Sequence, residues 1–170
     1  EGFHLEFFVK PFGTVPPYFK PGKGLESVIA DVEGVRTRTK RNLKNERKLL
    51  DEIEEMCPFL AEFETPNYEW ELADTENCLT AMLELEKPRE SGKLVVEWTK
   101  GQKLKLLGNV GFENFSLSVK GKNNWFEVEG KVKVSDDLVL SMQDLNQIIG
   151  QTTGNFVELS DGQFIAITEK

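Results

Sequence analysis

Basic side chains at alternating positions are the feature of this sequence that most clearly suggests a chemical role. Residues 34–48 contain seven basic residues and a single acid, Glu46. The basic residues are Arg36, Arg38, Lys40, Arg41, Lys44, Arg47 and Lys48. Because side chains alternate along a strand, the first three are predicted to share one face. A row of cations suits the regularly spaced charges of a phosphate backbone, so these seven residues form the candidate nucleic-acid-binding set.

A solvated strand face that pairs with acidic side chains further along the chain is the competing interpretation. The net charge of −8 hides a segregated pattern, because residues 49–86 carry twelve acids and no Lys or Arg. In the helix expected after the basic strand, Lys48 can pair with Glu52 and Arg47 with Asp51, at about 0.2–0.5 kcal/mol each. The sequence alone leaves both interpretations open.

A search for catalytic residues finds no complete site. Gly22-Lys23-Gly24 is not a phosphate-binding loop, because Pro17 stands where that motif requires glycine and Gly24 where it requires Ser or Thr. His4 has no evident carboxylate or nucleophile partner, and one histidine is weak ground for general-base chemistry. We therefore expect no catalytic residue and no enzyme activity in this chain.

Cysteine usage and composition limit the remaining classes. Cys57 and Cys78 lack a CxxC spacing, so buried reduced thiols in a cytoplasmic protein are expected, and neither a metal site nor a bound cofactor is predicted. Hydrophobic residues make up 39% of the 170 residues and charged residues 29%, as in soluble globular proteins. The sequence has no apolar run near the ~18 residues that a membrane span needs.

The basic residues need a hairpin and a helix to position them. Residues 27–31 and 35–41 flank Glu33-Gly34 and predict that hairpin. Asn42 is the expected N-cap of a helix through Met56. The elements expected around them are a strand over residues 3–12, an acidic connector over 59–71, and a second helix that Asp74 or Thr75 caps and Lys87-Pro88 ends.

The second half is predicted to be rich in β-structure. Strands are expected over residues 93–98, 103–110, 114–120 and 125–134, in an antiparallel meander. Ser141 and Asp144 form a capping box for a helix that ends at Gly150. Residues 155–160 and 163–168 form a hairpin around Asp161-Gly162. The predicted fold is α+β, antiparallel and β-rich with about three helices, as one domain or as two subdomains at 1–90 and 91–170.

The order of these stretches resembles a known family. The WF-led strand, the capped helix and the FVELSDGQFIAIT hairpin, with PGKGLESVIADVEGVRTRTKRNLKNERKLLDEI upstream, look like the region directly before the motor in bacterial Swi/Snf-related helicase-like ATPases. None of these stretches is a catalytic motif. The resemblance implies that ATP and Mg²⁺ would be bound by a motor following Lys170, and that this chain is a segment of a longer protein.

Two functions of different classes follow from the sequence. The resemblance implies a non-catalytic accessory region of an ATP-dependent DNA helicase or translocase, which braces the motor of the same chain or helps to hold duplex DNA with the basic residues. The alternative is a protein–protein interaction module that makes no contact with DNA. No membrane partner is expected in either case.

Overall fold

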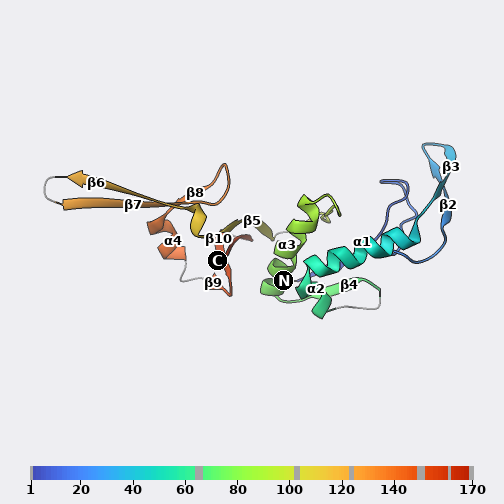
Figure 1. Cartoon of the computed structure of the whole chain (residues 1–170), viewed down its shortest axis with the longest axis horizontal. Coiled ribbons are helices and arrows are strands. Elements are labelled where there is room, and N and C mark those ends of the chain that lie inside the picture. The colour runs from blue at the N-terminus through green and yellow to red at the C-terminus, as the bar shows by residue number, and fades with distance from the viewer. Residues whose placement is uncertain are drawn as a thin grey trace. The chain divides into compact units, whose positions relative to one another are not determined.

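A computed structural model describes residues 2–63, 67–101, 104–122, 125–148, 152–160 and 162–168. Of the chain, 30% is helix and 38% is strand, which confirms the predicted α+β class. The described residues form four helices, three of them of seven or more residues, and several small, mostly antiparallel sheets. The chain divides into two compact units, Glu1–Val96 and Glu97–Lys170 (Figure 1). The boundary expected from the sequence, at 90/91, lies shortly before this division.

The first unit contains the basic hairpin and most of the helical residues. Its elements are β1 (Phe3–Glu6), β2 (Ser27–Val32), β3 (Val35–Lys40), α1 (Leu43–Met56), α2 (Pro58–Glu62), β4 (Glu69–Leu72) and α3 (Thr75–Glu90). The predicted hairpin is confirmed as β2–β3, and the two predicted helices as α1 and α3. Asn42 and Asp74 cap these helices as expected, since each side chain accepts a hydrogen bond from the amide three residues on.

The prediction that residues 59–71 form an acidic connector is wrong. This segment contains the short helix α2 and the strand β4, and β4 pairs antiparallel with β1, with Phe3 opposite Leu72. Strand β1 ends at Glu6, earlier than the strand predicted over residues 3–12. The two partner strands lie far apart in the sequence, so the local pattern of either one could not reveal their pairing.

The predicted end of the second helix at Lys87-Pro88 is also wrong. Helix α3 continues to Glu90, with Pro88 in its last turn. Proline lacks the amide that would donate to the preceding turn, which normally disfavours it inside a helix. Pro88 is fully buried, together with Cys78 and Leu79 of the same helix, so packing in the core of this unit offsets the missing hydrogen bond.

The second unit contains two small sheets that share one core. Its elements are β5 (Lys105–Val110), the 3₁₀ helix η1 (Phe112–Asn114), β6 (Phe115–Lys122), β7 (Trp125–Lys133), β8 (Val139–Ser141), α4 (Met142–Ile148), β9 (Thr152–Thr153), β10 (Phe156–Ser160) and β11 (Gln163–Ile167). The predicted hairpin is confirmed as β10–β11. The core includes Val110, Val132, Val134, Leu145, Val157 and Ile165, so it draws on both sheets.

The capping box predicted at the start of α4 is confirmed. The Asp144 amide donates to Ser141 Oγ at 3.1 Å, and the Ser141 amide donates to Asp144 Oδ2 at 3.2 Å. The predicted helix end at Gly150 and the turn residue Asp161 lie outside the described residues. The reciprocal bonds fix the start of α4, and the helix packs Leu145 into the core.

The prediction of an antiparallel meander for the second half of the chain is wrong. Strands β6, β7 and β8 form one antiparallel sheet, but β5 belongs to a second sheet of order β5-β11-β10-β9. Its partner there is β11, to which it runs parallel. Residues 93–98, predicted as a strand, have no strand structure. The local alternation of β5 correctly indicated a strand but did not specify which strand would pair with it.

Candidate nucleic-acid interface

The strand pairing of β2 and β3 places the basic residues on an exposed face. Arg36, Arg38 and Lys40 lie opposite Asp31, Ile29 and Ser27, so these three pairs share one side of the hairpin. All three cations are exposed. The other side carries Val28 and Ala30, which are buried. On β3 this side carries Thr37 and Thr39, which are half-buried, and Val35, which is exposed, so the predicted alternation of the cations with these three residues is confirmed.

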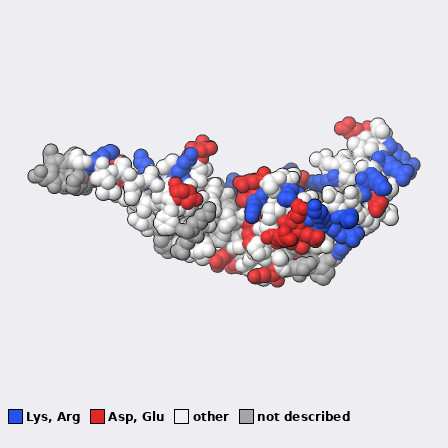
Figure 2. Space-filling model, in the orientation of Figure 1, with Lys and Arg blue, Asp and Glu red and all other residues white. Residues whose placement is uncertain are grey.

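Helix α1 adds three further cations in its first two turns. Lys44, Arg47 and Lys48 are exposed, and their spacing of three and four residues places them on one side of the helix. Figure 2 shows Lys and Arg atoms gathered over the β2–β3 hairpin and over α1, next to a cluster of acidic atoms. We define the basic face as the exposed cations of both elements, namely Arg36, Arg38, Lys40, Lys44, Arg47 and Lys48.

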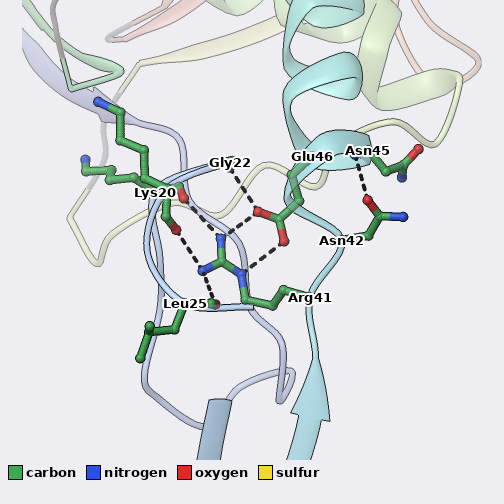
Figure 3. Close-up of polar contacts among 8 residues, drawn as sticks. Lys20, Gly22, Leu25, Arg41, Asn42, Asn45 and Glu46 are labelled. Carbon is green, nitrogen blue, oxygen red and sulfur yellow. Dashed lines mark hydrogen bonds and ion pairs between the residues drawn. The ribbon is translucent and has the colours of Figure 1, made fainter. Parts of the chain in front are cut away.

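Arg41 does not belong to this face, so its prediction as a nucleic-acid contact is wrong. Its side chain is 2% exposed and forms an ion pair with Glu46, with Nη2 2.5 Å from Oε2 (Figure 3). Nε donates to Glu46 Oε1 at 3.0 Å. The other guanidinium N–H groups donate to the main-chain carbonyls of Lys20, Lys23 and Leu25. All its donors are directed inward, so Arg41 has a structural role.

The Arg41–Glu46 pair joins three segments of the first unit. Arg41 directly follows β3, Glu46 lies in the first turn of α1, and the carbonyls that Arg41 contacts belong to the loop before β2. The Gly22 amide of that loop donates to Glu46 Oε2 at 3.0 Å. The guanidinium also lies over the ring of Phe19, 4.5 Å from its centroid. The network therefore fixes the hairpin against the helix that carries the other half of the basic face.

The basic face keeps most of its charge. Arg38 donates to the neutral Ser27 hydroxyl at 2.7 Å, and Lys40 lies 3.8 Å from Glu26. In the acidic stretch of residues 49–86, the predicted pair Lys48–Glu52 is present at 3.6 Å. Within the described part of the chain, Arg36, Lys44 and Arg47 have no carboxylate within ion-pair distance, so the predicted Arg47–Asp51 pair does not form. The acidic stretch thus neutralises little of this face.

A histidine–carboxylate pair lies elsewhere in the first unit and was missed from the sequence. His4 Nδ1 lies 2.6 Å from Glu71 Oε1, because β1 pairs with β4 and places these residues opposite each other. The expectation that His4 has no carboxylate partner is wrong. The two-residue spacings of His4 with Glu6 and of Glu69 with Glu71 were the available signal, since each pair shares a strand face.

This pair lines a cavity of about 330 Å³ but lacks the other parts of a catalytic site. Trp70, Leu72 and Phe63 contribute to the lining, and no Ser, Thr or Cys is among the described lining residues. Lys20 donates to both Glu6 and Glu69 at 2.6 Å, so a cation already occupies the carboxylates beside His4. Burial alone would lower the pKa of Lys20, but its bonds to Glu6 and Glu69 outweigh this effect and raise it.

The two cysteines are buried and free. Burial raises the pKa of the Cys57 thiol to about 11, so it stays protonated and unreactive near neutral pH. Among the residues that the structure describes, no group of three or more His, Cys, Asp or Glu side chains is arranged to hold a metal ion. None of the described helices is long and apolar enough to cross a membrane.

Comparisons with protein-family models, curated proteins and solved structures found no match for this chain.

Proposed function

We propose that this chain is a non-catalytic, DNA-contacting accessory region, which binds the phosphate backbone of duplex DNA through the basic face. The observation that carries this proposal is the set of six exposed cations on β3 and α1, of which only Lys40 and Lys48 lie within ion-pair distance of a described carboxylate. The resemblance to the region before a Swi/Snf-type motor supports the wider role. In that role ATP and Mg²⁺ are bound by the motor, and this chain braces the motor or helps to hold its DNA.

The spacing of the hairpin cations suits a phosphate backbone. Alternate residues on an antiparallel strand lie about 6.8 Å apart, so Arg36, Arg38 and Lys40 span about 14 Å. Phosphates of one DNA strand are spaced by about 3.4 Å along the helix axis, so this row covers roughly four phosphate steps. The contacts are to charge and not to base edges, and binding is therefore expected to show little dependence on DNA sequence.

The Arg41–Glu46 network gives this surface a fixed geometry. Arg41 follows the strand that carries three of the cations, and Glu46 lies between Lys44 and Arg47 on the helix that carries the others. Cations held on rigid elements lose less conformational freedom when they bind than cations on a loose tail. The buried pair thus contributes to binding indirectly, by holding the two parts of the basic face together.

A protein-interaction role without DNA contact is the second candidate. The observation that favours it is an apolar face on the β6–β7 hairpin, where Leu117, Val119 and Val128 are 72%, 63% and 61% exposed. Exposed apolar side chains gathered on one face are a common property of protein–protein interfaces. This face belongs to the other unit, so it is compatible with DNA binding by the first.

The proposal is tested by fluorescence anisotropy with a labelled duplex at about 50 mM salt, where phosphate contacts are strongest. The test variant carries Arg36→Gln, Arg38→Gln and Lys40→Gln and retains Arg41, because that side chain is buried. The control variant carries Lys105→Gln, Lys131→Gln and Lys133→Gln, three exposed cations of the second unit. Both variants lose the same net charge.

We expect the hairpin variant to bind on the order of tenfold more weakly, and the control to bind like the unmodified chain. Equal losses in both variants would show that net charge, and not the basic face, determines binding. Absence of binding by the unmodified chain at this salt concentration would overturn the proposal and favour the protein-interaction role.

A further inference from the structure

The β6–β7 hairpin presents an uncharged face along most of its length. Phe115 lies opposite Val132, Leu117 opposite Gly130, and Val119 opposite Val128, so these residues share one side. Val132 is fully buried at the base of the hairpin, whereas Leu117 and Val119 are 72% and 63% exposed. The core of the second unit therefore covers the base of this face and leaves the outer part open.

The outer edge of β6 is also open. Among the described strands β6 pairs only with β7, over eight consecutive positions without a register shift. An edge strand exposes a row of backbone N–H and C=O groups, and proteins usually protect such edges with charges, prolines or bulges. Residues 115–119, Phe-Ser-Leu-Ser-Val, contain neither a charge nor a proline. This edge is therefore able to accept another strand.

We propose that β6 pairs antiparallel with β6 of a second copy of this chain, about a two-fold axis that passes beside Ser118. In this register Ser118 faces its own counterpart, and Leu117 of each copy lies opposite Val119 of the other. Ser116 lies opposite Lys120, and Phe115 opposite Gly121. The two hairpins then form one continuous sheet with their apolar side chains on the same side.

The pattern of charges along β6 is compatible with this register and excludes one alternative. Two-fold pairing keeps apolar residues on a common side only when the axis passes beside a residue, because side chains alternate. An axis beside Lys120 would place two lysines directly opposite each other, which is destabilising. An axis beside Ser118 instead places Lys120 opposite the neutral Ser116 and uses seven residues, from Phe115 to Gly121.

Gly121 distinguishes this register from those with the axis beside Leu117 or Val119, in which no two lysines meet either. A Cβ atom added at Gly121 would meet no other atom within 4 Å, so its backbone is uncovered. A cross-strand aromatic ring can cover an exposed glycine in a sheet, and this register brings Phe115 of the other copy opposite it. Phe115 is 37% exposed, so part of its ring is available for this contact.

The contact is short, which defines the kind of complex expected. Seven paired residues extend about 24 Å along one edge, whereas a standard interface contains roughly 20–30 residues on each side. The dimer is therefore expected to be weak and to dissociate on dilution. This inference does not depend on DNA binding, since its residues all belong to the second unit.

Sedimentation velocity of the full chain, from about 5 to about 500 µM, tests the proposal by mass action. We expect the mean sedimentation coefficient to rise with concentration toward that of a dimer. Ser118→Lys places two like charges at the axis and is expected to abolish the rise, as is Ser118→Glu. Ser118 is exposed, so both monomers should stay folded, with Ser118→Glu the less stable because Glu129 lies opposite it in the same hairpin; circular dichroism checks both.

An equimolar mixture of the Ser118→Lys and Ser118→Glu proteins should form the dimer again, because opposite charges then meet at the axis. Ser160→Lys is the control, since it adds the same charge at an exposed serine on β10 and should leave association unchanged. A chain that stays monomeric over the whole range would overturn the proposal. So would a dimer that Ser118→Lys does not weaken, or a mixture that does not associate.

Discussion

The β2–β3 and β6–β7 hairpins have the same local topology but present opposite chemistry to their surroundings. In β2–β3 the apolar residues Val28 and Ala30 are buried and the cations point outward. In β6–β7 the outward side includes Leu117 and Val119, which are more than half exposed. Alternation along a strand creates two faces in both cases, and both faces of β6 are exposed, including the apolar one. A polyanion suits the first hairpin and an apolar protein surface suits the second.

The two hairpins are also attached to their units in different ways. Hairpin β2–β3 is joined to α1 through the buried Arg41–Glu46 pair. Hairpin β6–β7 is attached through apolar packing, with Val132 and Leu145 in the same core cluster. Met142 packs so close to Gly130 that an added Cβ would lie 2.1 Å from its Cγ. The attachment of the first hairpin to its helix should therefore be sensitive to loss of this ion pair, and that of the second hairpin to loss of apolar volume.

Breaking the polar attachment should have the largest effect. Arg41→Met leaves the Glu46 carboxylate, which is 13% exposed, without its cation, and we expect the free energy of unfolding to fall by about 3–5 kcal/mol. Urea denaturation followed by circular dichroism measures the loss. The double variant Arg41→Met/Glu46→Met removes the orphaned charge and should recover part of it. A single-variant loss below about 1 kcal/mol would mean that the pair does not hold the hairpin.

Breaking the apolar attachment should have a comparable or smaller effect. Leu145→Ala opens a cavity in the core of the second unit and should cost about 2–5 kcal/mol. Leu117→Ala is the control on the exposed face of the β6–β7 hairpin and should change stability by less than about 0.5 kcal/mol. Similar losses at both positions would show that the face of Leu117 is covered in solution.

The capping box at the start of α4 is a polar contribution in the second unit, where the hairpin is otherwise attached by apolar packing. Ser141→Ala removes the acceptor of the Asp144 amide and should cost about 1 kcal/mol. Ser116→Ala, at an exposed serine on β6, is the control and should be nearly neutral. Equal urea midpoints for the two variants would contradict a stabilising role for the cap.

The smallest expected effect is the pH dependence of the Lys20 contacts in the first unit. The hydrogen bond from Lys20 lowers the pKa of Glu69, so this carboxylate stabilises the fold above its ordinary value of 4.5 and loses that contribution as the pH falls through its folded pKa. The raised pKa of Lys20 gives a contribution that is complete below 10.5 and is lost as the pH rises through the folded value.

The stability difference between the unmodified chain and Lys20→Met should therefore be greatest between these limits, near neutral pH, and should decrease toward both extremes. Urea midpoints measured across this range check the sign. A difference that stays constant with pH would show that Lys20 contributes through packing and not through its charge.

Local patterns predicted the elements of the basic face correctly, because hairpins and helix starts depend on neighbouring residues. Glu33-Gly34 indicated the β2–β3 turn, Asn42 indicated the start of α1, and alternation placed Arg36 on an exposed face. The capping box of Ser141 and Asp144 was predicted from neighbouring residues in the same way. Each of these features depends on residues a few positions apart, where sequence and structure are most directly related.

The errors concern contacts between distant parts of the chain. Arg41 continues the run of cations in the sequence, but carbonyls of a loop some twenty residues earlier surround it, and no local pattern shows this. The pairing of His4 with a carboxylate on β4 and the pairing of β5 with β11 were missed for the same reason, since each joins residues far apart in the sequence. Pro88 stayed in a helix because its surroundings in the core outweighed its local preference.

Phosphate binding by the hairpin cations is measured by the dependence of DNA affinity on salt, for the unmodified chain and for the Arg36→Gln/Arg38→Gln/Lys40→Gln variant. Each phosphate contact contributes about −0.9 to the slope of log affinity against log salt. We expect the slope of this variant to be shallower by about 2.7, and the slope of the second-unit control variant to be unchanged. Identical slopes for the chain and the hairpin variant would contradict the proposal, because the hairpin cations would then contact no phosphate.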